Sequence, residues 1–167
     1  YLDLSQNELQ GCCMPPMIEN LSQLEHLYFQ ENQFRGPIPP QIGDLTNLIT
    51  LKANDNYNGY DEQTGLTGEI PDEIGNLTNL VTLDLSNNHL EGIIPEEFCD
   101  LNINFNSANF DISDNELCAD TEGNYPDCID SSMGTQDITE CGGGTTCAAG
   151  EVRLWGNCNL GGNSDGC

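Results

Sequence analysis

The sequence repeats itself, and this repeat limits the possible folds more than any other feature. Residues 83–95 contain a Leu-x-Leu-x-x-Asn-x-Leu run followed by Gly and Ile-Pro. Consecutive runs start 25, 24, 32 and 27 residues apart. A unit of this length cannot bury its own apolar face, so the units must stack into a solenoid with one continuous core. The five units start near Leu2, Leu27, Leu51, Leu83 and Phe110.

Each unit predicts one short strand and one tight turn. In the Leu-x-Leu pair both leucines point inward and the residue between them points outward. The asparagine stands where the chain leaves the strand, where its amide can satisfy backbone groups that the turn leaves open. Gly and Ile-Pro then favour a turn, and 3₁₀ or irregular backbone should follow. We expect one ladder of stacked asparagines: Asn7, Asn32, Asn56, Asn88 and Asn115.

The stretch LTGEIPDEIGNLTNLVTLDLSNN at residues 66–88 resembles the plant-type leucine-rich repeat of about 24 residues. This class occurs in plant receptor ectodomains and polygalacturonase inhibitors. The resemblance implies an α/β solenoid, a right-handed superhelix with short parallel strands on the concave face and 3₁₀ or irregular turns on the convex face. It also implies extracellular recognition, but no particular ligand.

The chain divides into two segments of different composition. The repeats fill residues 1–118, and residues 119–167 form a Cys-rich C-terminal cap or tail rich in Ser, Thr, Gly and Asp. Within this tail, residues 152–157 repeat the Leu-x-Leu-x-x-Asn pattern and predict one more strand of the repeat type. Tyr1 stands in the middle of a repeat, so we interpret the chain as a processed product, a fragment or one segment of a longer protein.

The charge of the chain is strongly negative. Three basic residues face 28 acidic ones, giving a formal charge of −25. Such a charge repels nucleic acid, anionic membranes and polyanionic pectin, and it favours basic partners and divalent cations. No apolar run approaches the roughly 20 residues that span a bilayer. No cofactor is expected; a weaker alternative is a calcium site among acids whose spacing fits no defined loop, namely Asp120, Glu122, Asp127 and Asp130.

The cysteines and two sequons point to an oxidising, extracellular compartment. Nine cysteines in 167 residues are typical of secreted proteins. The resemblance to the cap of plant-type repeats favours a bond between Cys118 and Cys128. Cys99 occupies a similar offset one turn earlier and could instead bond to Cys128; the spacing leaves this open. Cys141 and Cys147 would close a short loop, and Asn20 and Asn76 fit the N-glycosylation pattern.

The outward residues of the predicted strands form a candidate ligand-binding surface on the concave face. Proteins of the resembled family usually bind ligands there, whereas the alternative is an ordinary solvated sheet. The third unit also carries eight extra residues after Asn56, which predict a loop at one edge. The candidate binding residues are His26, Tyr28, Gln30, Thr50, Lys52, Asn54, Thr82, Asp84, Ser86 and Asp111.

Two functions follow, and neither is catalytic, since no nucleophile stands beside either histidine. The first is a structural module that associates with itself head to tail into a filament, because an uncapped solenoid end exposes apolar core and strand edge. The alternative is a monomer that binds a peptide, glycan or other extracellular protein. The candidate assembly residues are Tyr1, Leu2, Leu4, Cys12, Cys13, Val152, Leu154, Trp155, Cys158 and Cys167.

Overall fold

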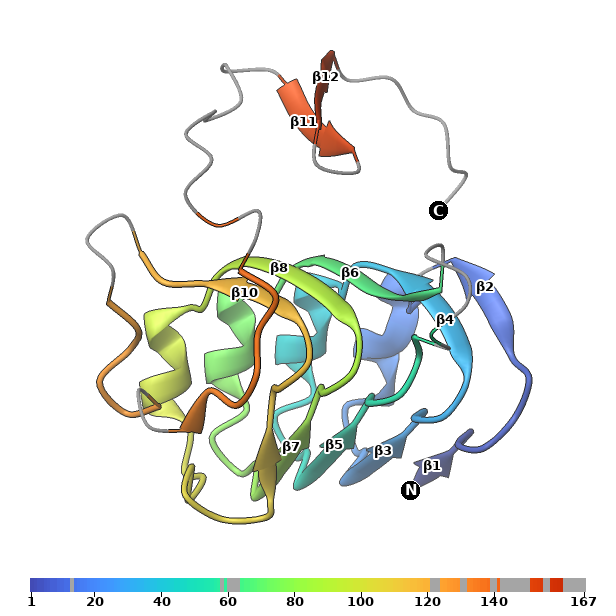
Figure 1. Ribbon diagram of the computed structural model, residues 1–167. Coiled ribbons are helices and arrows are strands. Elements are labelled where there is room, and N and C mark those ends of the chain that lie inside the picture. Colours follow the sequence, from blue (N-terminus) through green and yellow to red (C-terminus); the bar gives the residue numbers. More distant parts are fainter. Residues whose placement is uncertain are drawn as a thin grey trace.

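The chain winds into stacked coils that carry two parallel sheets (Figure 1). The computed structural model describes residues 1–12, 14–57, 59, 64–120, 124–129, 132–138, 141, 151–154 and 157–160. The side chains of residues 12, 16, 151–154 and 157–160 are not described. Each of the first four coils consists of a strand of the first sheet, a strand of the second sheet and a 3₁₀ helix, and the fifth coil contributes β9 and β10.

The first sheet contains the predicted Leu-x-Leu strands in the order β1-β3-β5-β7-β9. Its register aligns Leu27 with Leu51, then Leu83 and Phe110, and all four side chains are buried. The predicted solenoid fold is therefore confirmed. The strands are β1 (Leu2–Asp3), β3 (His26–Tyr28), β5 (Thr50–Lys52), β7 (Thr82–Asp84) and β9 (Phe110–Asp111).

Four 3₁₀ helices follow the Pro-containing segments, as the sequence predicts. Each begins directly after a proline whose backbone is extended. Ile42 of η2 and Ile74 of η3 are fully buried in the core. The helices are η1 (Pro16–Leu21), η2 (Pro40–Asp44), η3 (Asp72–Asn76) and η4 (Glu96–Asp100).

The sequence analysis missed the second sheet, whose order is β10-β8-β6-β4-β2. Its strands lie in the segments that follow the ladder asparagines. These segments lack the alternation of apolar and polar residues that is typical of a half-buried strand. Pairing with the neighbouring coils satisfies their backbone groups. The strands are β2 (Gln10–Cys12), β4 (Gln33–Gly36), β6 (Gly65–Glu69), β8 (His89–Ile93) and β10 (Glu116–Cys118).

The asparagine ladder is present and joins each coil to the one before it. The Asn115 amide donates to the backbone oxygens of Leu85, Ile112 and Ser113, at 3.0–3.1 Å. Its Oδ1 accepts the backbone N–H of Leu90 at 3.0 Å. Because each buried asparagine satisfies groups in two coils, the ladder fixes the stacking as well as the turn. Asn32, Asn56 and Asn88 are bonded in the same way.

A glutamine continues the ladder beyond the predicted repeats. Gln136 donates to the backbone oxygens of Ile112 and Met133 at 2.9 Å, and its Oε1 accepts the N–H of Leu117 at 3.2 Å. Ile129 and Met133 are buried in the same core. Residues 124–129 and 132–137 thus form part of another coil, and we infer that the solenoid ends near residue 137 rather than at the predicted boundary of 118.

The tail strand predicted at residues 152–157 is present but does not pair as predicted. β11 (Glu151–Leu154) pairs antiparallel with β12 (Asn157–Leu160), with Leu154 opposite Asn157. The prediction of a repeat-type parallel strand is therefore wrong. A two-residue connection lets adjacent segments satisfy each other's backbone groups locally, without another coil.

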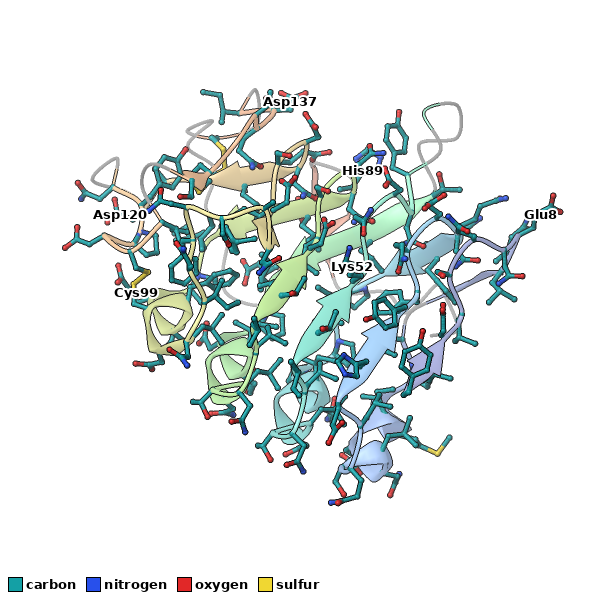
Figure 2. All side chains as sticks on the ribbon, turned by 90° about the horizontal axis from the view of Figure 1, so that it is seen from below. Glu8, Lys52, His89, Cys99, Asp120 and Asp137 are labelled. Carbon is teal, nitrogen blue, oxygen red and sulfur yellow. A yellow bond between two sulfur atoms is a disulfide. The ribbon has the colours of Figure 1, made fainter. Side chains whose placement is uncertain are left out.

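Two disulfides close the C-terminal part of the solenoid. Cys99 is bonded to Cys128, and Cys118 is bonded to Cys141. The pairing of Cys118 with Cys128 that the resemblance favours is therefore wrong, and the alternative partner for Cys128, one coil earlier, is correct. The Cα atoms of Cys99 and Cys128 are 5.6 Å apart, close to the spacing of adjacent coils. Figure 2 shows the bond at Cys99, which belongs to η4. The predicted loop closed by Cys141 and Cys147 is also wrong, because Cys141 is bonded to Cys118. Cys147 lies outside the described residues.

Candidate functional site

The exposed face of the first sheet carries the candidate binding residues in register. Tyr28, Lys52 and Asp84 are direct neighbours on β3, β5 and β7, and Asp3 and Asp111 extend this row on either side. His26, Thr50 and Thr82 form a second row beside it. Figure 2 shows Lys52 on this sheet, whereas His89 lies on the second sheet. The strands thus bring the predicted residues together on one surface.

Three aromatic rings gather at one end of this face. The rings of His26 and Tyr28 are nearly parallel, 11° apart, with centroids separated by 6.3 Å. The Tyr1 ring lies 5.5 Å from Tyr28 and 6.1 Å from His26. Tyr1 donates to the Asp3 carboxylate at 3.2 Å, and His26 Nδ1 lies 3.1 Å from the Thr50 hydroxyl. We call Tyr1, His26 and Tyr28 the aromatic cluster.

Three Asp-x-Ser pairs occupy the same strands. The hydroxyl of Ser86 donates to Asp84 Oδ1 at 2.8 Å, and Ser113 donates to Asp111 Oδ1 at 2.6 Å. Ser5 donates in the same way to Asp3, and the two hydrogen bonds from Ser5 lower the pKa of that carboxyl. Each serine hydroxyl donates its proton to the aspartate of its own pair. The pair therefore presents oxygen acceptors to the solvent.

Asp84 is the most enclosed of these carboxylates. Burial raises its pKa, and the like charge of Asp111 adds to this effect, while hydrogen bonds from Ser86 and the charge of Lys52 oppose it. Because the pKa of Asp84 is higher in the folded state than in the unfolded state, the folded chain binds this proton more readily. The ionised carboxylate therefore costs stability, and this cost appears as the pH rises from the unfolded-state pKa through the folded-state pKa.

We therefore expect Asp84→Asn to raise the unfolding free energy at neutral pH, and to have no such effect below the ordinary aspartate pKa. The gain should stay below about 1 kcal/mol, since solvent screens a half-exposed group. The Asn oxygen can still accept both bonds from Ser86. Urea unfolding at two pH values, with Asp111→Asn as the control on the next strand, measures this. Equal gains at both pH values would contradict the explanation.

The remaining candidate residues on this face are half-buried or buried. Thr50 is buried under His26, and Thr82 and Ser86 are half-buried. Gln30 Oε1 and Asn54 Oδ1 are enclosed and lack a hydrogen-bond partner. Asn54 instead donates to Asp55 at 2.6 Å.

A second polar cluster lies on the second sheet and was not predicted. His89 Nδ1 lies 2.7 Å from Glu116 Oε1, and the Tyr57 ring packs on His89 with centroids 4.3 Å apart. Sequence reasoning missed it because β8 and β10 were not expected as strands. Tyr57 and Gly65 mark the two ends of the predicted insert, whose residues 58 and 60–63 lie outside the described residues. The cluster attaches the base of this insert to the sheet.

The assembly candidates lie in different parts of the chain. Leu2 and Leu4 line an apolar cavity of about 310 Å³ at the first coil, together with Met14, Met17, Ile18 and Leu21. Tyr1 belongs to the aromatic cluster. The side chains of Cys12, Val152, Leu154 and Cys158 are not described, and Cys13, Trp155 and Cys167 lie outside the described residues.

No metal centre stands out in the described residues. They contain no group of three or more His, Cys, Asp or Glu side chains that could hold a metal ion. Asp120 accepts from the backbone and side-chain amides of Asn124. Of the other calcium candidates, Glu122 and Asp130 lie outside the described residues. The described part of the chain also contains no helix with the length and apolar character of a membrane span.

Both sequon asparagines lie on exposed 3₁₀ turns. Asn20 is the second-last residue of η1, and Asn76 is the last residue of η3. We expect both to carry glycans when the protein is expressed through a eukaryotic secretory pathway. Intact-mass measurement of Asn20→Gln and Asn76→Gln should show the loss of one glycan each, and Asn79→Gln, outside a sequon, should show none. Unchanged mass in either sequon variant would contradict the prediction at that site.

Comparison with known proteins agrees with this geometry. The Leucine Rich Repeat family matches residues 23–45 and 79–101. Receptor-like protein EIX1 of Solanum lycopersicum is 43% identical over 56 residues, which are 34% of this chain and 5% of that protein. The plant peptide hormone receptor RGFR1, solved in complex with RGF2, is 38% identical with a TM-score of 0.59, over 70% of this chain and 17% of that chain.

A second similar structure is that of the BIR3–SERK2 complex from Arabidopsis thaliana. It is 26% identical with a TM-score of 0.64, and the match covers 81% of this chain and 66% of that chain. The chain thus spans about a twentieth of the receptor-like protein EIX1 and about a sixth of RGFR1.

The repeats, the two-sheet coil and these matches identify a leucine-rich repeat protein of the plant extracellular type. Its two disulfides and its receptor-like relatives place it outside the cell or at the cell surface.

Proposed function

We propose that the chain is a non-catalytic recognition module that binds an extended peptide across the exposed face of the first sheet. The observation that carries this proposal is the unbroken register of aromatic, basic and acidic side chains over five strands. Five strands at about 4.8 Å spacing span roughly 19 Å, the length of about six extended residues. The complex of RGFR1 with RGF2, a similar repeat structure, supports a peptide as the ligand class.

The proposal can be tested without a known ligand. A library of displayed random 12-residue peptides, selected on the protein, should yield binders that compete with one another. Thr82→Arg places a long side chain on β7, next to the central strand β5, and should weaken such binders at least tenfold. Glu97→Arg places the same residue on η4, away from this face, and should leave binding unchanged. Recovery of no binders, or equal effects of the two variants, would overturn the proposal.

A second candidate function is self-association through the apolar surface of the first coil. Met17 is 72% exposed and Leu21 41% exposed beside the cavity described above, and a contiguous apolar surface of this kind favours association. The opposite end exposes less apolar surface, because Ile129 and Met133 are buried against the last coil and the strand edge of β11 is paired with β12. Sedimentation of the protein and of Met17→Glu/Leu21→Glu tests this candidate, which fails if both sediment as monomers.

A further inference from the structure

We infer that the peptide is basic, with a proline or aromatic residue on the aromatic cluster and a lysine or arginine near Asp84 and Asp111. This inference rests on the proposed function and specifies its ligand. It follows from the different chemistry of the two halves of the same face.

The aromatic half offers exposed ring surface, and two of its polar atoms already have partners within the chain. The Tyr1 hydroxyl donates a hydrogen bond to Asp3, and His26 Nδ1 is hydrogen-bonded with the Thr50 hydroxyl. Tyr1 nevertheless remains 76% exposed. Three rings in mutual contact form a platform for another flat apolar group, and proline and aromatic side chains are the peptide groups that pack best on such a surface.

The acidic half lacks a cation of its own. Asp84 and Asp111 are in register on adjacent strands, so their carboxylates lie about one strand spacing apart. Within the described residues, the recorded ion pair is that of His89 with Glu116 on the other sheet. Lys52 faces Asp84 from β5, which leaves the Asp111 side open. The whole chain, with three basic and 28 acidic residues, complements a basic ligand.

The remaining polar groups of this face also require donors. Ser86 and Ser113 direct their protons to the aspartates, so only their lone pairs remain for a ligand. Lysine and arginine supply several N–H donors and no acceptor, so they match this surface better than any acidic or amide side chain.

The register also sets the spacing within the peptide. Tyr28 is two strands from Asp84 and three from Asp111, which corresponds to roughly 10–14 Å. An extended peptide advances about 3.3 Å per residue. The ring-bearing residue and the basic residue should therefore be about three or four positions apart.

The displayed 12-residue library also tests this inference. The recovered peptides should be enriched in lysine or arginine three or four positions from a proline or aromatic residue. Asp84→Asn/Asp111→Asn should weaken them about three- to thirtyfold, the range for two exposed charge pairs. Glu96→Gln/Glu97→Gln removes the same charge from η4 and should change affinity less than twofold at moderate salt.

The outcomes separate the inference from the proposed function. Neutral or acidic binders that are still blocked by Thr82→Arg would overturn the inference and leave peptide recognition standing. Equal losses in the two charge-neutralised variants would show general attraction rather than a site at Asp84 and Asp111, and would also overturn it. Binders insensitive to Thr82→Arg would overturn both. For the aromatic half, Tyr28→Ala should abolish the preference for a ring residue while the preference for a basic residue persists.

Discussion

Asn88→Ala is expected to lower the free energy of unfolding by about 3–5 kcal/mol, a large part of the stability of a domain of this size. Asn88 is 3% exposed, and its amide donates to the backbone oxygens of Ala53, Leu85 and Ser86 at 3.0–3.1 Å. Its Oδ1 accepts the N–H of Leu66 at 3.0 Å. Alanine would leave the buried N–H of Leu66 without this acceptor and would remove three bonds that join two adjacent coils. The three backbone oxygens would keep their other donors, which are Asn56, Asn115 and the N–H of Asp55.

The control for this substitution is Asn7→Ala in the first coil. Asn7 holds the same position in the repeat and donates to the backbone oxygens of Leu4 and Ser5, but it is exposed. Water can replace its amide, so the expected loss is below about 1 kcal/mol. Urea unfolding of the two variants gives the comparison. Similar losses at both positions would show that the asparagine stabilises only its own turn and not the stacking of coils.

The ladder shows how far the sequence alone can predict this fold. Leu-x-Leu and Asn recur at fixed offsets, so the stacked strands, the 3₁₀ turns and the amide ladder could be predicted from residue chemistry. Gln136 could not, because a glutamine has one more methylene group and its segment lacks the Leu-x-Leu pair. Its role depends on a backbone path that positions its longer side chain at the same carbonyl groups. The boundary predicted from the repeat pattern, residue 118, therefore lies before the residue near which we infer that the solenoid ends.

The sequence predicts which residues share this face of the first sheet, but it does not predict that the face divides into an aromatic half and an acidic half. Alternation along each strand places Tyr28, Lys52 and Asp84 on the outer face, and the repeat makes them neighbours. The ring contacts of Tyr1 and the direction of each serine proton depend on rotamers, which the sequence does not specify. The cluster around His89 required the second sheet, whose strands carry no clear period. Disulfide pairing likewise depended on which cysteines the coil brings within 5.6 Å.

Gly43→Ala is expected to destabilise the protein by about 2–3 kcal/mol, although alanine normally favours folding over glycine. A Cβ atom at this position in η2 would lie 2.5 Å from the backbone oxygen of Glu73 and 2.7 Å from its Cβ. Both atoms belong to the backbone region of η3 in the next coil, so no side-chain rotation relieves the contact. The two coils must separate, and the strands on both sheets would have to follow.

Gly11→Ala is the matched control, because a Cβ atom there meets no other atom within 4 Å. Neither glycine has a positive φ, so backbone strain does not distinguish them. Gly11→Ala should leave stability unchanged or raise it by less than about 1 kcal/mol, through the smaller entropy of its unfolded chain. Thermal or urea unfolding measures both. A loss of similar size in both variants would mean that the distance between η2 and η3 does not limit the stacking, and that the strands alone determine the separation of the coils.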